Sequence, residues 1–274
     1  MATAYAGVDM SKWQANVDYN QLARGKIGNA PVEFAMLRYS YGKSKDAMFD
    51  KHYNGCKEAG IKVGAYHWLR AQTVEDAKLE GEWLAAKLKK YQLEYPVAID
   101  FEDPELFALG LTKSQYTAIV DEFGSALAAA GYYVILYTNP DTLENRLNKD
   151  ILDRYELWLA HWVTNPANYG QTIWQYAALG TAAQVKSGNA TRVGAVQGAN
   201  GPCDVNWSYV DYEAKIKNAG KNGFTIKKPA STATTAKKTY FIVGTKVCES
   251  AAALTTAKNQ LKALGYDHIV VETK

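Results

Sequence analysis

The sequence has few cysteines, no strong excess of charge of one sign and no recognisable metal-binding cluster. Its three cysteines, Cys56, Cys203 and Cys248, lie far apart and show no C-x-x-C spacing. An odd number of widely spaced cysteines argues against a disulfide framework and against a cysteine-ligated metal, so we expect no metal and no cofactor. The net charge of +3 at pH 7 by itself argues neither for nor against a nucleic-acid partner, and we expect none.

The sequence also lacks the patterns of a membrane span and of a secretory signal. The uncharged stretch over 124–140 contains two Gly, an Asn and a Pro, and it is typical of a helix end followed by a strand. The N-terminal residues "MATAYAGVDM" have neither the basic nor the apolar region of a signal peptide. We therefore expect a chain that is made and folded in a cytoplasm and does not insert into a membrane.

Aromatic residues, in contrast, are plentiful. The chain has 19 Tyr, 7 Trp and 7 Phe, many of them beside the ends of expected strands. Aromatic rings are good stacking platforms for sugars, but Tyr-rich cores also exist, so this composition is only a weak indication of a glycan ligand.

Strand-like and helix-like segments alternate along most of the chain, which is typical of α/β proteins. The expected strands are 5–9, 34–39, 62–68, 96–101, 132–138, 156–161, 172–176 and 203–207. Helical patterns follow only the first five strands, at 17–25, 47–59, 73–91, 113–130 and 141–152. Eight strands with five helices predict an irregular (β/α)5(β)3 TIM-like barrel. A doubly wound open sheet is the alternative, but no G-x-G-x-x-G motif or P-loop follows any strand.

The composition changes near residue 225. Residues 225–274 carry 8 Lys and 3 acids, a balance of +5, which leaves 23 − 25 = −2 for residues 1–224. We predict a catalytic barrel over 1–224, a linker over 225–238 whose small, polar and basic residues are typical of flexible segments, and a small βαβ unit over 239–274.

Acidic residues stand at the ends of several expected strands. The stretch "YPVAIDFED" (95–103) runs an apolar strand directly into Asp100 and Glu102, which lie two positions apart and so share a strand face, roughly 6–7 Å from each other. Asp9 ends the first strand, and Asp204 belongs to the eighth, which neighbours the first in a closed barrel. Each acid alone also fits a turn or a helix cap. Together they predict a carboxylate cluster at one mouth of the barrel, where such folds place their active sites.

Clustered carboxylates drive one another's pKa values apart, so that one stays protonated while another is ionised. Glycoside hydrolysis uses this combination, because an acid protonates the leaving oxygen and a carboxylate acts at the anomeric carbon. The cluster therefore indicates a glycosidase.

Around these acids the chain resembles glycoside hydrolase family 25, the muramidases of bacterial and phage cell-wall lysins. The resemblance covers about residues 5–215. The matching segments are "GVDMSKWQ" (7–14), "FAMLRYSYG" (34–42), "AGIKVGAYHW" (59–68), "PVAIDFED" (96–103), "VILYTN" (134–139), "LWLAHW" (157–162), "IWQY" (173–176) and "CDVNW" (203–207). The resemblance implies cleavage of the β-1,4 bond between N-acetylmuramic acid and N-acetylglucosamine, with Glu102 as general acid and Asp9, Asp100 and Asp204 around it. We expect the ionised Asp100 beside Glu102, together with partial burial, to keep Glu102 protonated near neutral pH.

Other residues are expected to bind substrate or to shape the groove. Arg38 is placed to pair with the acids or to anchor a turn, and His161 is expected to be a wall residue rather than a base. The segment over 180–202 is longer than the connection expected there and is expected to reshape one rim. Aromatic side chains that suit sugar stacking or core packing are Tyr66, Trp68, Tyr137, Trp158 and Trp174.

The sequence thus predicts a phage endolysin, released to act on the cell wall, with peptidoglycan as its partner. A secreted bacterial autolysin, a hydrolase of chitin-like glycans and a non-catalytic glycan-binding protein are the alternatives. The strand-helix-strand pattern over 239–274 resembles half of a SPOR-type peptidoglycan-binding domain. Because one βαβ unit leaves a sheet face and an edge uncovered, we expect two chains to pair through it as a homodimer, the alternative being a unit that docks on its own barrel or is loosely ordered.

Overall fold

The chain divides into two units, Met1–Lys227 and Lys228–Lys274. The computed structural model describes residues 4–226 together with residues 252, 255, 256 and 259. The predicted linker and βαβ unit, and with them the resemblance to a SPOR domain, lie almost wholly outside the described residues. The following account concerns the first unit.

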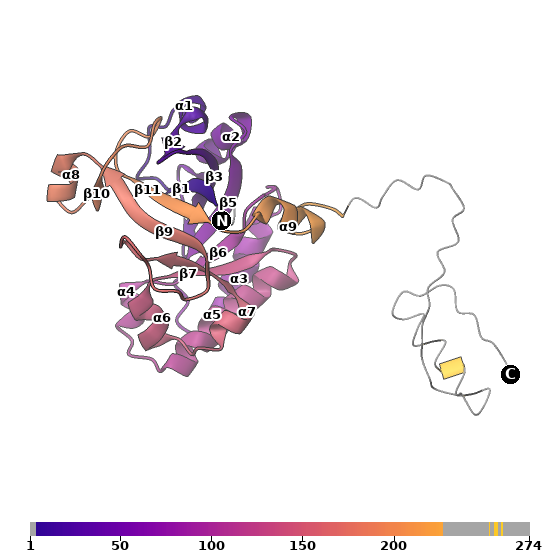
Figure 1. Cartoon of the computed structure of the whole chain (residues 1–274). Helices are drawn as coiled ribbons and strands as arrows, with labels where there is room; N and C mark the ends of the chain where they lie inside the picture. Colours follow the sequence, from indigo (N-terminus) through magenta and orange to yellow (C-terminus); the bar gives the residue numbers. More distant parts are fainter. Residues whose placement is uncertain (1–3, 227–251, 253–254, 257–258, 260–274) are drawn as a thin grey trace, which may run out of the picture. The chain divides into compact units, whose positions relative to one another are not determined.

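Eight strands of the first unit close into a barrel (Figure 1), which confirms the predicted fold class. The order around the barrel is β1-β3-β5-β6-β7-β8-β9-β11, and β11 pairs with β1 to close the ring. The strands are β1 (Tyr5–Met10), β3 (Ala30–Tyr41), β5 (Lys62–Trp68), β6 (Val97–Asp100), β7 (Val134–Thr138), β8 (Glu156–Ala160), β9 (Gln171–Gly180) and β11 (Cys203–Ser208).

The last strand, β11, runs antiparallel to both of its neighbours, whereas the other adjacent strands of the ring are parallel. The beginning of β11 therefore lies at the mouth where the other strands end. In this register Asp204, the second residue of β11, is directly opposite Asp9, near the end of β1. The antiparallel direction is thus what brings an acid from the start of one strand to an acid at the end of another.

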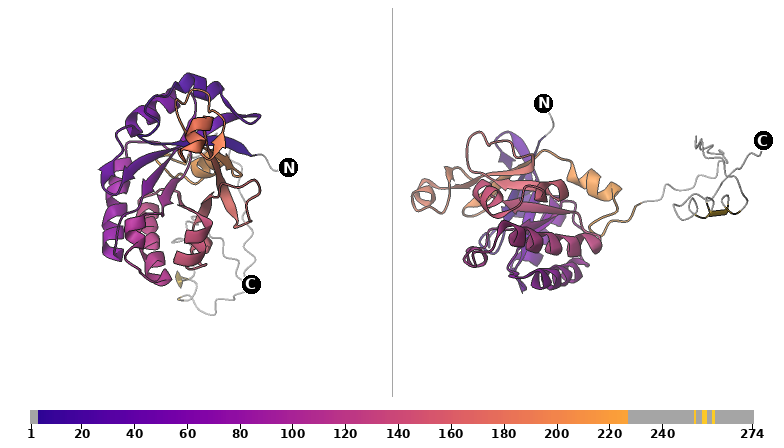
Figure 2. Two further views of the ribbon diagram at one scale, coloured as in Figure 1. Left: turned by 90° about the vertical axis from the view of Figure 1, so that its left-hand side faces the viewer. Right: turned by 90° about the horizontal axis from the view of Figure 1, so that it is seen from below.

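Helices follow the early strands as predicted, and in Figure 2 (left) the indigo-to-magenta helices form an arc along one side of the strands. They are α1 (Tyr19–Arg24), α2 (Phe49–Glu58), α3 (Val74–Leu88), α5 (Lys113–Ala129), α6 (Pro140–Arg146) and α7 (Ile151–Arg154). Side-chain caps fix four of the starts: Asp18 for α1, Thr73 for α3, Thr112 in a capping box for α5 and Asn139 for α6. The helix predicted over 141–152 is two short helices, because Leu147 has extended backbone angles.

Six short elements were not predicted: β2 (Lys26–Ile27), β4 (Ser44–Lys45), α4 (Pro104–Phe107), α8 (Ala182–Lys186), β10 (Arg192–Val193) and α9 (Tyr212–Asn218). Both α8 and β10 belong to the long segment over 180–202. The end of this segment is tied to the loop after β1, since Gln14 Nε2 donates to the Pro202 carbonyl at 2.9 Å and the Asp18 N–H to the Gly198 carbonyl at 2.8 Å. These hydrogen bonds therefore hold the end of the segment against the loop after β1.

The interior of the barrel is filled by large apolar side chains, several of them aromatic. Phe34 stacks on Tyr95 with ring centroids 4.2 Å apart. A Cβ atom on Gly7 of β1 would lie 2.4 Å from the Phe34 ring, so only glycine leaves room for this plug. The buried interior residues are Phe34, Met36, Tyr95, Ala98, Ile135, Tyr137, Trp158, Ile173, Tyr212 and Ile216.

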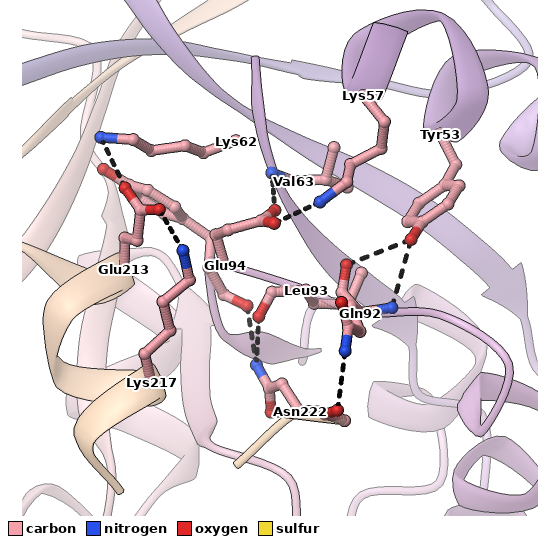
Figure 3. A network of polar contacts seen from close by, with 12 residues as sticks. Tyr53, Lys57, Lys62, Val63, Gln92, Leu93, Glu94, Glu213, Lys217 and Asn222 are labelled. Carbon is pink, nitrogen blue, oxygen red and sulfur yellow. Dashed lines mark hydrogen bonds and ion pairs between the residues drawn. The ribbon is translucent and has the colours of Figure 1, made fainter. Parts of the chain in front are cut away.

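The end of the barrel opposite the acids is closed by α9 and the turn after it (Figure 3). Asn222, with a φ of 56°, donates from Nδ2 to the carbonyls of Leu93 (3.1 Å) and Tyr95 (2.9 Å). Its Oδ1 accepts the Tyr133 N–H at 2.7 Å. Lys62 of β5 pairs with Glu213 of α9 at 3.2 Å. Residues up to 222 are therefore part of the barrel's own packing.

Candidate active site

A cavity of about 190 Å³ opens at the mouth where the predicted acids meet. All ten predicted site residues line it except Trp174. The lining residues are Asp9, Ser11, Trp13, Gln14, Arg38, Tyr66, Trp68, Asp100, Glu102, Tyr137, Trp158, Gln175 and Asp204. Side chains from β1, β3, β5, β6, β7, β8, β9 and β11 thus converge on one space, as a closed barrel requires.

Trp174 lies outside the lining because side chains alternate along β9. Its neighbour Gln175 is 2% exposed and lines the cavity, so Trp174 points to the other face of the strand. There its indole N–H donates to the His161 carbonyl at 2.7 Å. The expectation that Trp174 stacks on substrate in the cavity is therefore corrected. His161 does not line the cavity either.

Among the carboxyls of the cluster, Asp9 has the most hydrogen-bond donors from the protein. Its Oδ2 accepts from Gln175 Nε2 at 2.9 Å and from Asn206 Nδ2 at 2.8 Å. Burial raises the pKa of Asp9 above its usual value, and these two hydrogen bonds and one with Asp204 offset part of that rise. Gln175 and Asn206 were not singled out from the sequence, although both stand in the segments "IWQY" and "CDVNW". The alternation of side chains along the two strands could have indicated that both residues face inward on β9 and β11.

Glu102 carries the pKa expected of a general acid. Burial, followed by the negative charge of Asp9, raises its pKa to about 7. A carboxyl with this pKa is partly protonated at neutral pH, which is the state that can donate a proton to a leaving group.

Asp100 differs from the sequence-based expectation that it is the ionised neighbour of Glu102. It is 2% exposed, and its Oδ1 has no hydrogen-bond partner among the described residues. Burial raises its pKa well above the usual range, the charge of Glu102 raises it further, and Arg38 opposes both effects. Asp100 is thus held protonated, and the charge that acts on Glu102 comes from Asp9.

Asp204 is also held protonated. Burial raises its pKa well above the usual range, and so do the charge of Asp9 and a hydrogen bond with that residue. Among the four carboxyls, Asp9 is therefore the one supplied with hydrogen-bond donors, Asp100 and Asp204 retain their protons, and Glu102 is partly protonated at neutral pH.

Arg38 is held in place by Asp46, a residue that was not singled out from the sequence. Arg38 Nε and Nη2 both lie 2.8 Å from Asp46 Oδ2. Asp46 Oδ2 also accepts the Lys12 N–H at 3.0 Å, and Oδ1 accepts the Met48 N–H at 2.9 Å. Asp46 thereby fixes the position of the Arg38 guanidinium group, whose positive charge lowers the pKa of Asp100.

Aromatic residues form both the floor and the rim of the cavity. On the floor, Trp158 packs edge-on against Tyr137 and Tyr66, with ring centroids 4.5 Å and 6.0 Å apart. At the rim, Trp68 donates from Nε1 to the buried Asp103 at 2.8 Å. Trp13 is 74% exposed and lines the cavity, whereas Trp162, although 51% exposed, is not among the lining residues. An exposed ring has a free face for a sugar, so Trp13 offers a better platform than most of the aromatics chosen from the sequence.

Within residues 4–226 and the four described residues of the second unit, no group of three or more His, Cys, Asp and Glu side chains is arranged to hold a metal ion. The same part of the chain has no helix long and apolar enough to cross a membrane.

Comparison with known proteins agrees with this geometry. The family "Glycosyl hydrolases family 25" matches residues 8–185, a range that includes Asp9, Asp100 and Glu102 and stops before Asp204. An "Autolytic lysozyme" of Clostridium acetobutylicum is 29% identical over 163 residues, which are 59% of this chain and 46% of that protein. The chain therefore spans about half the length of this relative.

Solved structures show the same fold. A bacterial lysozyme from Streptomyces coelicolor superimposes with a TM-score of 0.61 at 23% identity, covering 81% of this chain and 99% of that one. The catalytic domain of endolysin ply40, from bacteriophage P40 of Listeria monocytogenes, gives a TM-score of 0.59 at 20% identity, covering 81% and 98%.

Proposed function

The chain belongs to glycosyl hydrolases family 25, and on this premise we propose that it cleaves the β-1,4 bond between N-acetylmuramic acid and N-acetylglucosamine in bacterial peptidoglycan. The observation that carries the proposal is the pairing, in one cavity, of Glu102, with a pKa of about 7, and the donor-supplied carboxylate of Asp9. The relative named as an autolytic lysozyme supports the choice of substrate.

In the proposed reaction Glu102 is the general acid. Its proton passes to the glycosidic oxygen as the bond to the anomeric carbon breaks, so that the leaving sugar departs as an alcohol. Positive charge develops on the sugar ring in this step, and the negative charge of Asp9 stabilises it. Water then bonds to the anomeric carbon and gives a proton to a carboxylate of the site, which completes the hydrolysis. Asp204 shares its proton with Asp9 and keeps that carboxylate in position.

Asp100 has a separate role in the proposal. Its Oδ1 is buried, unpartnered among the described residues and part of the cavity lining. A protonated carboxyl is both a donor and an acceptor, and a buried polar atom without a partner is costly unless a ligand supplies one. Asp100 therefore hydrogen-bonds the bound sugar, which orients the sugar beside Glu102.

The proposal is tested with the full-length chain on two substrates. We expect it to clear a suspension of purified Gram-positive cell walls and to release no soluble sugar from chitin. The Glu102→Gln variant, which keeps the shape of the side chain and loses the acid, is the matched control. Release from chitin with walls left intact would favour the chitin-like alternative, and binding to walls without clearing would favour a glycan-binding protein.

We further propose that the chain is an endolysin that acts on the wall after release from the cell that makes it. The fold similarity to a bacteriophage endolysin supports this assignment, while the autolytic relative supports a bacterial autolysin as the alternative. Expression in a susceptible host separates the two. An endolysin lyses the culture only when a membrane-permeabilising protein is co-expressed, whereas an exported autolysin lyses it alone.

The finer partner proposal is a homodimer through residues 239–274. Its support is the single strand-helix-strand pattern in the sequence, because this segment lies almost wholly outside the described residues. Light scattering of the full chain and of residues 1–226 tests it. A larger particle for the full chain alone is the expected result, and two monomers at micromolar concentration would rule the pairing out.

A further inference from the structure

Two buried amide side chains, Gln175 and Asn206, meet at a single oxygen of Asp9. Gln175 is 2% exposed and Asn206 is fully buried. Gln175 Nε2 lies 2.9 Å from Asp9 Oδ2, and Asn206 Nδ2 lies 2.8 Å from the same atom. Burying two amides against one carboxyl needs a reason, because each amide must find partners for both of its ends.

The other ends of the amides fix which way they face. Trp158 Nε1 lies 2.8 Å from Asn206 Oδ1, and Trp162 Nε1 lies 3.1 Å from Gln175 Oε1. An indole N–H only donates, so the atom that faces it must be the amide oxygen. If either amide were turned over, two donors would face each other. The two tryptophans thereby force both NH₂ groups toward Asp9.

A carboxyl oxygen that receives two N–H donors acts as an acceptor in both contacts. These two donors therefore stabilise the ionised form of Asp9, because a proton on Oδ2 would face two N–H groups and find no acceptor. The hydrogen bond with Asp204 also favours the ionised form of Asp9, since it lowers the pKa of Asp9 and raises that of Asp204.

We propose that Gln175 and Asn206 are positioning residues that hold Asp9 as the fixed anion of the site, and that this anion keeps the proton on Glu102. Trp158 and Trp162 act one step further out, by setting the orientation of the amides. The inference rests on the proposed function for its kinetic meaning. Its structural part concerns only the protonation of Asp9 and Glu102.

Other charged and titratable groups surround Asp9 and act on the same balance. The residues are Arg38 on β3, Tyr66 on β5, Asp100 and Glu102 at the end of β6, Tyr137 on β7, and Cys203 and Asp204 on β11. Arg38 is the cation among them, and Asp46 is already paired with it at 2.8 Å. The amides are thus the donors that lie directly on Asp9.

The direction of the effect on catalysis follows from these contacts. Removing a donor raises the pKa of Asp9, so a higher pH is needed to ionise it. The acidic limb of the pH–rate profile, where Asp9 takes up its proton, therefore moves to higher pH. The alkaline limb is the loss of the Glu102 proton while Asp9 is ionised, so it does not move down, and the active range narrows from the acidic side.

The experiment uses Gln175→Met and Asn206→Leu, which keep most of the side-chain volume and remove the amide. We expect the acidic limb of the kcat/KM profile on cell walls to move up by about one pH unit and the alkaline limb to stay in place. Gln171→Met, at the start of β9, is the matched control and should leave the profile unchanged. A lower rate with the acidic limb unmoved would show a merely structural role and overturn the proposal.

Two additions keep the test decisive. Asn206→Leu leaves the Trp158 N–H without a partner, so the double variant with Trp158→Phe removes that donor as well and should show the same shift. Carbon-13 NMR titration of the Asp9 and Glu102 carboxyls, identified by their loss in Asp9→Asn and Glu102→Gln, needs no substrate. An Asp9 midpoint that does not rise in the amide variants, or a Glu102 midpoint near 7 that does not fall in Asp9→Asn, would refute the inference, even if the chain hydrolyses some other glycan.

Discussion

Glu102 keeps its proton near neutral pH because it is buried and because it faces the negative charge of Asp9. The neighbour two positions before it, Asp100, contributes little to that charge, since its own burial favours the protonated form. In the proposed reaction the two carboxyls of the segment over 100–102 therefore have different tasks: Glu102 donates a proton and Asp100 contacts the sugar.

At the residue scale, the first prediction concerns Glu102→Gln. Lytic activity should fall by orders of magnitude because the general acid is lost, with a typical contribution of about 10²–10⁴-fold for such a group. In the native chain, activity on walls should decline as the pH rises through about 7, the pKa of Glu102. Turbidity assays across pH 5–9 check both statements, and near-normal clearing by the variant would remove Glu102 from its role.

The stability of the same variant has a defined pH dependence. The pKa of Glu102 is raised on folding from 4.5 to about 7, so the folded chain binds more protons than the unfolded chain between these values, and its stability falls as the pH rises through that range. Gln cannot ionise and avoids this loss. The Tm of the variant relative to the native chain should therefore be higher at pH 8 than at pH 4, whereas equal differences at both pH values would contradict the burial of an acid here.

Asp9 and Asp204 should behave as a unit in mutagenesis. Each Asn variant should lose activity, but the double variant should lose much less than the product of the two single losses, because each change already disrupts the shared hydrogen bond. Initial rates of wall clearing for the two single variants and the double variant complete the cycle. A double loss equal to the product would mean that the two acids act independently.

Trp13 offers a test of binding apart from stability. It is 74% exposed and lines the cavity, so Trp13→Ala should change the free energy of unfolding by no more than about 0.5 kcal/mol. Activity at low wall concentration should fall several-fold while the rate at saturation changes less, since a stacking platform is lost. An unchanged concentration dependence would exclude Trp13 from binding substrate.

At the element scale, apolar periodicity and Gly stops in the sequence were enough to place the eight strands and most of the helices. Strand direction was not readable in this way. An antiparallel β11 has the same side-chain period as a parallel strand, and only the length of the preceding segment over 180–202 hinted at a different connection. Asp204 was nevertheless placed at the mouth, because the first and last strands of a closed barrel are neighbours in either direction.

The same limit explains the errors at single residues. Side-chain alternation on β9 depends on one strand's phase, and a shift of one residue exchanges Trp174 for Gln175 as the residue that lines the cavity. Polar residues such as Gln175, Asn206 and Asp46 carry no periodic signal of their own. Their roles appear only when distant segments meet, as the separation of 197 positions between Asn206 and Asp9 illustrates.

The turn after α9, which closes the end of the barrel opposite the acids, gives a prediction for this element. Asn222 has a φ of 56°, is fully buried and makes three side-chain hydrogen bonds. Asn222→Ala should destabilise the barrel by roughly 3–5 kcal/mol, combining backbone strain with unsatisfied carbonyl and N–H groups. Urea unfolding measures the change, Asn189→Ala in the exposed segment is the control, and a loss below about 1 kcal/mol would show that α9 docks without this residue.

At the scale of the whole molecule, the described barrel holds a complete carboxyl site, and a second, basic segment follows it in the sequence. The site explains why acids end an apolar strand: in "YPVAIDFED" the apolar residues fill the barrel wall, and burial of the acids that follow sets the pKa that the reaction needs. The central claim is therefore a chemical one, that this cavity hydrolyses the muramyl bond by proton transfer from Glu102.

The most direct test is to digest purified peptidoglycan with the full chain, reduce the new sugar ends with borohydride and identify them by mass spectrometry. The account predicts that every new reducing end is N-acetylmuramic acid and that Glu102→Gln produces none. New reducing ends on N-acetylglucosamine, or release of peptides without new sugar ends, would contradict it.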